Sequence, residues 1–182
     1  NLVRWNGTQW DSVGGKFGGG WVKSLCIDSI NNVLYIGGGI TYAGTVPVFS
    51  VAKWDGTNLS APGMGITNGA YAMTMYQGKL VVGGNGWSDT TLATWDGTYW
   101  CPMVLDPNNT ITALGEYNGK LYVGGSFTQI DTMPVNYFAT WSGNPCLNSG
   151  INTFNHKLRF KVFPNPAKAE ININVEEEEN KE

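Results

Sequence analysis

Seven carboxylates are the residues of this sequence that come closest to a catalytic set. A pair of Asp or Glu side chains can hydrolyse a glycosidic bond, one as general acid and the other as nucleophile or base. The candidates are Asp28, Asp55, Asp89, Asp96, Asp106, Glu116 and Asp131. Asp55 and Asp96 each precede a glycine, where turn formation alone explains an aspartate. The other five lie in expected loops or near strand ends, so we predict no catalytic residue in this chain.

Nucleophilic, metal-dependent and phosphate-binding sites lack their usual residues. The single histidine, His156, lies near the C-terminus, so no Ser-His-Asp or Cys-His arrangement can form within residues 1–147. Cys26, Cys101 and Cys146 show no C-x-x-C spacing, and whether two of them pair is open. The Gly-rich segments lack the Gly-Lys-Ser/Thr ending of a phosphate loop. We therefore predict no metal and no cofactor.

Two tryptophans are the candidates for ligand binding. Trp21 and Trp87 each follow a Gly-rich stretch, in segments 13–21 and 83–87, and we expect both in connecting loops. An exposed indole on a rigid scaffold can stack on a sugar ring or anchor a protein. Packing between neighbouring repeats is the alternative role, and the sequence favours it for each of the two.

The composition indicates a β-rich domain. Of 182 residues only 14% are charged, whereas 25 are glycine and 8 are tryptophan. Such a composition disfavours disorder and favours short strands joined by tight turns. The net charge of −3 provides no basic surface for nucleic acid, and no apolar run is long enough to span a membrane.

An internal repeat organises most of the chain. Segments 24–38, 70–84 and 111–125 align without a gap, and each ends in a Gly pair. Segments 40–54 and 127–141 also align without a gap, which gives repeat periods of 46 and then 41 residues. Self-similarity at this period is the signature of a repeat architecture, in which each unit is one small supersecondary structure.

Each repeat contains four strand-like runs. In the third repeat the first two runs are Ile111–Tyr117 and Lys120–Gly125. Two-residue turns with positive φ are expected between these runs, at Asn118-Gly119, Gln77-Gly78 and Asn31-Asn32. We expect the Gly pairs to lie where a neighbouring backbone excludes side chains.

The phrase W-[D/N]-G-T-x-W joins the third and fourth runs. It occurs within residues 4–10, 53–59 and 94–100, with a weaker version at 140–146. We predict a hairpin in which the glycine permits the turn and the fourth strand ends at the second Trp. The first Trp recurs at one repeat position and is therefore expected in the core. These residues are Trp5, Trp54, Trp95 and Trp141.

The predicted fold is an all-β, β-propeller-type array of four-stranded antiparallel blades. The phrase L-Y-V-G-G-x-F-T, followed by P-V-x-x-x-A-x-W, resembles kelch-type and galactose-oxidase-like propeller repeats of secreted bacterial surface proteins. Residues 1–147 would hold a partial unit at 2–13 and units at about 22–62, 70–105 and 110–147. Propellers typically need four or more blades to close, so we expect further blades upstream, and an open array with an exposed edge is the alternative. The copper site of galactose-oxidase relatives is not implied here, because histidine is missing from these repeats.

The C-terminal segment follows a different pattern. After a polar linker at 148–160, residues 161–182 contain Val162-Phe163-Pro164-Asn165-Pro166-Ala167 and then alternating apolar positions. This phrase resembles the start of the C-terminal sorting domain of the type IX secretion system. Such domains are several times longer, so the segment reads as a truncated copy that forms a short β tail. Any Pro-rich turn before a strand is the alternative interpretation.

These patterns lead us to expect a non-catalytic binding or adhesion module in the extracellular space or at the outer-membrane surface. Its partners would be a glycan or a surface protein, together with the secretion machinery through Pro164, Asn165 and Pro166. The alternatives are a fragment of a polysaccharide-acting enzyme whose catalytic residues lie upstream, and a structural spacer.

Overall fold

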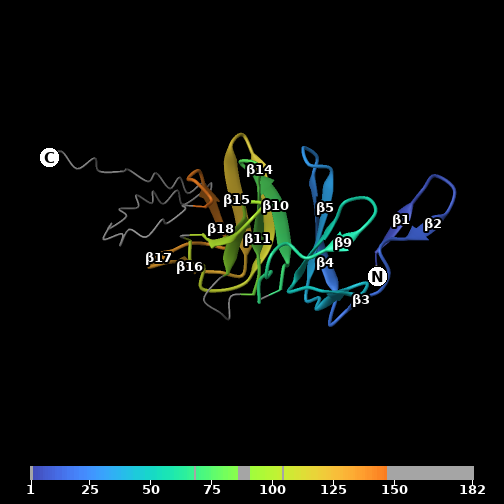
Figure 1. Ribbon diagram of the computed structural model, residues 1–182. Coiled ribbons are helices and arrows are strands. Elements are labelled where there is room, and N and C mark those ends of the chain that lie inside the picture. Colours follow the sequence, from blue (N-terminus) through green and yellow to red (C-terminus); the bar gives the residue numbers. More distant parts are fainter. Residues whose placement is uncertain (1, 68, 86–90, 104, 147–182) are drawn as a thin grey trace.

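The computed structural model describes residues 2–67, 69–85, 91–103 and 105–146, and in this part every regular element is a β-strand (Figure 1). All strand pairs are antiparallel, and they form several small sheets. The prediction of an all-β fold is therefore confirmed for these residues. No helix of the described residues is long and apolar enough to cross a membrane.

Three main sheets follow one another along the chain, side by side (Figure 1). Sheet 1 contains β4 (Val22–Asp28), β5 (Val33–Gly38), β8 (Val51–Trp54) and β9 (Leu59–Ser60). Sheet 2 contains β10 (Ala72–Tyr76), β11 (Lys79–Gly83), β12 (Leu92–Trp95) and β13 (Trp100–Pro102). Sheet 3 contains β14 (Ile111–Tyr117), β15 (Lys120–Gly125) and β18 (Phe138–Trp141). Sheets 1 and 2 have the predicted four strands. Sheet 3 has three strands within the described residues, which end at residue 146, the position that aligns with the start of the fourth strand in sheet 2.

Smaller elements flank these sheets. The strands are β1 (Val3–Trp5) with β2 (Trp10–Ser12), β3 (Phe17–Gly18) with β6 (Tyr42–Ala43) and β7 (Val46–Pro47), and β16 (Gln129–Ile130) with β17 (Met133–Pro134). Gly44 and Asp131 occupy matching turns in the last two groups and both have positive φ, at 61° and 51°. The insertions between the second and third strands of sheets 1 and 3 are therefore alike.

The turn between the first two strands differs among the sheets. Asn118 and Gly119, like Gln77 and Gly78, form two-residue turns with positive φ, as predicted. In sheet 1 the prediction is wrong, because Asp28 pairs with Val33 and leaves a four-residue turn. The backbone N–H groups of Ile30 and Asn31 donate to Asp28 Oδ1, at 3.1 and 3.0 Å. The carboxylate thus stabilises a longer turn that a gap-free alignment conceals.

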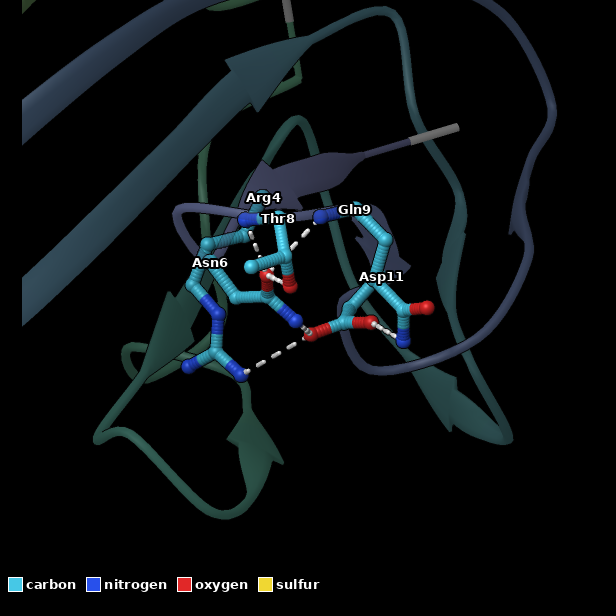
Figure 2. A network of polar contacts seen from close by, with 5 residues as sticks. All are labelled: Arg4, Asn6, Thr8, Gln9 and Asp11. Atoms are coloured by element: carbon cyan, nitrogen blue, oxygen red, sulfur yellow. Dashed lines mark hydrogen bonds and ion pairs between the residues drawn. The ribbon is translucent and has the colours of Figure 1, made fainter.

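The W-[D/N]-G-T-x-W phrase forms the same turn at residues 4–10, 53–59 and 94–100. Asp96 Oδ1 accepts hydrogen bonds from the backbone N–H groups of Thr98 and Tyr99, at 2.8 and 2.7 Å. Asp55 does the same for residues 57 and 58, and Asn6 for residues 8 and 9 (Figure 2). The three glycines have φ of 97° to 105°. The phrase is a local folding unit, although its second Trp begins the fourth strand instead of ending it.

Strand alternation gives every main sheet two apolar faces. We call the face on the side of the preceding sheet in the sequence the upstream face, and the face on the side of the following sheet the downstream face. The upstream face carries Leu80, Val82 and Trp95 in sheet 2, and it packs in one core cluster with Tyr35 and Val51 of the downstream face of sheet 1. The next interface repeats this arrangement, with the downstream side chains of sheet 2 against the upstream side chains of sheet 3. The core therefore consists of interfaces between sheets.

The predicted burial of the repeated tryptophans holds for two of the four. Trp95 and Trp141 are buried, at 8% and 4% exposure. Trp54 is half-buried, and Trp5 is 51% exposed. The prediction is wrong for Trp5, because the β1–β2 hairpin has no described sheet upstream of it to cover the indole (Figure 1).

The Gly pairs of sheets 1 and 3 lie against backbone, as predicted. A Cβ atom on Gly38 would overlap the carbonyl oxygen of Trp21, and one on Gly125 would overlap that of Thr110. In sheet 2 a Cβ atom on Gly83, the first glycine of its pair, would meet the side chain of Ile111 at the start of β14. In sheets 1 and 3 glycine therefore allows the loop before the first strand to lie close to the second strand, whereas Gly83 makes room for the first strand of the next sheet.

Candidate functional site

A pocket of about 340 Å³ lies between sheets 1 and 2, where β5 ends and β10 begins. Its apolar wall includes Phe49, Ile66 and Tyr71, and no charged side chain is present among the described lining residues. Polar groups come from Thr41, Ser50, Thr67 and Asn85. Aromatic surface combined with neutral hydrogen-bonding groups suits an uncharged, hydroxyl-rich ligand.

Local contacts hold the aromatic wall of this pocket. The ammonium group of Lys23 lies 3.7 Å from the centre of the Tyr71 ring, within the range of a cation–π interaction. The loop beside Phe49 approaches closely, because the N–H of Ile66 donates to the Phe49 carbonyl oxygen at 3.0 Å. Ser50 has a φ of 65°, and its hydroxyl accepts a hydrogen bond from the N–H of Gly69 at 3.1 Å. These contacts preorganise the pocket.

Trp21 lies directly before β4 and is 78% exposed, which confirms its expected loop position. Its carbonyl oxygen accepts a hydrogen bond from the N–H of Gly39, a residue that lines the pocket. The backbone of Trp21 is therefore fixed beside the pocket, while its indole remains available on the surface.

Most of the candidate carboxylates serve their own turns. Asp28, Asp55 and Asp96 accept hydrogen bonds within the turns described above, and Glu116 accepts one from the N–H of Gly119 at 2.8 Å. Burial opposes ionisation of Asp28, but its hydrogen bonds with Asn31 and Ile30 outweigh burial and lower its pKa. Asp28 and Asp55 belong to sheet 1, Asp96 to sheet 2 and Glu116 to sheet 3, and each serves a different turn.

Asp106 and Asp131 are the two candidates that the structure brings together. The N–H of Asp131 donates to the Asp106 carbonyl oxygen at 3.0 Å, and the N–H of Asp106 lies 3.3 Å from Asp131 Oδ1. Burial and the nearby Asp106 charge raise the pKa of Asp131. Neither residue lines the pocket. Their contacts join the turn between β16 and β17 to the segment before β14, which is a structural role.

Two cysteines form a disulfide between sheets. Cys101 in β13 is bonded to Cys146, which follows β18, and their Cα atoms are 5.6 Å apart. Cys26 is a buried free thiol. Candidate ligand atoms of Asp96, Cys101 and Cys146 lie within 4.8 Å of one another, but the disulfide leaves no thiolate for a metal there.

Several predicted residues lie outside the described part of the chain. They are Trp87, Asp89 and the proposed sorting motif Pro164, Asn165 and Pro166. Phe49 and Tyr71 could not be recognised from the repeat pattern, because neither recurs at a matching repeat position. Phe49 lies in the segment between the Gly pair and the A-x-W motif, which is five residues longer in the first repeat than in the second. This extra length was the nearest indication of a functional loop.

Comparison with known proteins gives no match for this chain. No protein-family model, no curated protein and no solved structure is significantly similar to it.

Proposed function

We propose that this chain is a non-catalytic binding module that recognises an uncharged carbohydrate in the pocket between sheets 1 and 2. The observation that carries the proposal is the lining of that pocket, in which Phe49 and Tyr71 combine with neutral polar groups. Sugar rings offer apolar C–H faces to aromatic side chains and hydroxyls to polar ones. Trp21, on the adjacent backbone, would extend the contact to a second sugar unit.

The scaffold in this proposal is a β-propeller-type array. The packing of the first strands supports a β-propeller-type array, because β10 of sheet 2 lies close to both β4 of sheet 1 and β14 of sheet 3. Sheets that meet at their first strands and present matching faces can fan around an axis, as blades do. A rigid array of this kind presents the loops between strands as a binding surface.

We further propose that the protein acts outside the cell, exported by a type IX-like route through residues 161–182. The disulfide between Cys101 and Cys146 supports an oxidising destination, since structural disulfides persist in secreted proteins. A fusion of residues 148–182 to a reporter should be exported by a bacterium that has this secretion system. Retention of the fusion inside that bacterium would contradict the export proposal.

A glycan-array screen followed by calorimetry tests the binding proposal. Tyr71→Ala and Phe49→Ala should each weaken the best glycan about tenfold, equivalent to roughly 1.4 kcal/mol. Tyr42→Ala is the matched control, because Tyr42 is an exposed aromatic residue that does not line the pocket. Absence of any glycan ligand would contradict the proposal and favour a spacer. Release of new reducing ends from a bound polysaccharide would instead favour an enzyme.

A further inference from the structure

Backbone hydrogen bonds already use carbonyl oxygens on one wall of the pocket between sheets 1 and 2. The carbonyl oxygens of Ile40, Thr41 and Phe49, which line the pocket, each accept a hydrogen bond from a backbone N–H at 3.0 Å. The polar groups left for a ligand are therefore mainly side chains, and two of these side chains are Ser50 and Asn85.

Asn85 brings an oriented side-chain amide to this pocket. It follows β11 of sheet 2 and lines the pocket. The hydroxyl of Thr110, which is not a lining residue, donates a hydrogen bond to Asn85 Oδ1 at 3.2 Å. No described residue accepts a hydrogen bond from Asn85 Nδ2. Because Thr110 holds the amide oxygen, the amide nitrogen is left to donate to a ligand.

Ser50 supplies a second donor. Its side chain is buried, and its hydroxyl oxygen accepts the hydrogen bond from the N–H of Gly69. That bond uses a lone pair of the oxygen and leaves the hydroxyl hydrogen, for which the described residues provide no acceptor. A buried donor without a partner costs free energy, and an acceptor on a ligand would remove that cost.

The apolar wall adds a second requirement to these two donors. Phe49, Ile66 and Tyr71 form this wall, so the bound group should combine an acceptor oxygen with a small apolar part. A sugar hydroxyl has no apolar part and donates as readily as it accepts. An acetamido group has both features, because its carbonyl oxygen only accepts and its methyl group is apolar.

We infer that the pocket selects an N-acetylated hexosamine, whose acetamido oxygen accepts from Asn85 Nδ2 and whose methyl group packs against Phe49 and Tyr71. This inference rests on the proposed carbohydrate binding and adds the class of sugar. The acetamido group is neutral, which suits a pocket without a charged side chain among its described lining residues. Thr110 is then a positioning residue, because it acts through Asn85.

Titration of N-acetylglucosamine and N-acetylgalactosamine, each compared with its parent sugar, tests the inference. Glucose and galactose are the parents, and each pair differs only in an acetamido group in place of a hydroxyl. We expect at least one acetylated sugar to bind about tenfold more tightly than its parent, the factor for one hydrogen bond. Nuclear magnetic resonance titration, which detects weak binding to single sugars, measures the dissociation constants.

Three variants test the two residues that orient the acetamido group. Asn85→Asp removes the donor but keeps the shape and an acceptor for Thr110, so the preference for the acetylated sugar should disappear. The parent sugar should still bind, because a hydroxyl can donate to the new carboxylate. Thr110→Val should reduce the preference, whereas Thr110→Ser keeps the hydroxyl and should retain it. A purely structural role of Thr110 would weaken both sugars equally.

The outcomes separate this inference from the proposed function. Equal affinities for acetylated and parent sugars would overturn it and leave carbohydrate binding intact, as would array ligands that all lack an acetamido group. A preference that persists in Asn85→Asp and in Thr110→Val would also overturn it. Absence of any glycan ligand would contradict both the inference and the proposed function. Circular dichroism checks that the variants remain folded.

Discussion

Trp100 donates its indole N–H to the carbonyl oxygen of Pro62 at 2.6 Å, which joins the first strand residue of β13 to the loop that follows sheet 1. The neighbouring Trp95 packs beside it, with ring centroids 5.4 Å apart. Gly63 lies so close to Trp95 that a side chain there would displace the indole. The Trp pair of sheet 2 is therefore part of the interface between sheets 1 and 2.

We expect Trp100→Phe to lower the free energy of unfolding by about 1–3 kcal/mol, because the Pro62 carbonyl would lose its partner. Trp10→Phe is the matched control. Trp10 occupies the same place in the β1–β2 hairpin, 5.5 Å from Trp5, but it is exposed. Its substitution should change stability by less than about 0.5 kcal/mol. Urea denaturation of both variants measures the difference, and equal effects would show that the Pro62 contact contributes nothing.

Removal of the disulfide should destabilise the chain by about 2–4 kcal/mol, because Cys101 and Cys146 are 45 residues apart and their bond restricts the unfolded chain. The double variant Cys101→Ala/Cys146→Ala, compared with the parent by thermal denaturation, gives the value. Reducing agent should lower the melting temperature of the parent but leave the double variant unchanged. A parent that is insensitive to reduction would argue against this bond.

Cys26 should make stability fall at alkaline pH. Burial, reinforced by the charge of Asp28, raises the pKa of Cys26 from 9.0 to about 11. The unfolded thiol ionises first, so this residue should have no effect on the pH dependence below pH 9, and stability should decrease as the pH rises from 9 to 11. The difference between the parent and Cys26→Ala across this range isolates the thiol from other titrating groups. Parallel curves for the two proteins would refute the prediction.

The turn glycine of the repeated phrase should resist substitution. Gly97 has a φ of 102°, a conformation that L-residues rarely adopt, so Gly97→Ala should cost about 1–3 kcal/mol of stability. Gly115 is the matched control, because it lies in β14 without positive φ and a Cβ atom there would meet open space. Chemical denaturation should show at most a small effect of Gly115→Ala. A similar loss for both variants would mean that backbone strain is not the cause.

Local hydrogen bonding explains which features the sequence could predict. The W-[D/N]-G-T-x-W turns follow from residues within four positions of one another, since the Asp or Asn side chain binds the next backbone N–H groups and glycine supplies the φ. The strands Ile111–Tyr117 and Lys120–Gly125 have their predicted bounds, because the two-residue turn between them is also set by local residues. In sheet 1, Asp28 favoured a longer turn, which repeat alignment alone did not reveal.

Only the tertiary structure decided what each repeat packs against. Trp5 and Trp95 occupy the same repeat position, but only Trp95 has a neighbouring sheet to bury it. Tyr76 and Tyr117 are the last residues of the equivalent strands β10 and β14, but Tyr76 is buried whereas Tyr117 is exposed. The disulfide between Cys101 and Cys146, and the pocket beside Phe49, likewise depend on contacts between residues far apart in the chain. The sequence determined the strands and their turns through short-range contacts, whereas burial depends on which sheets meet in space.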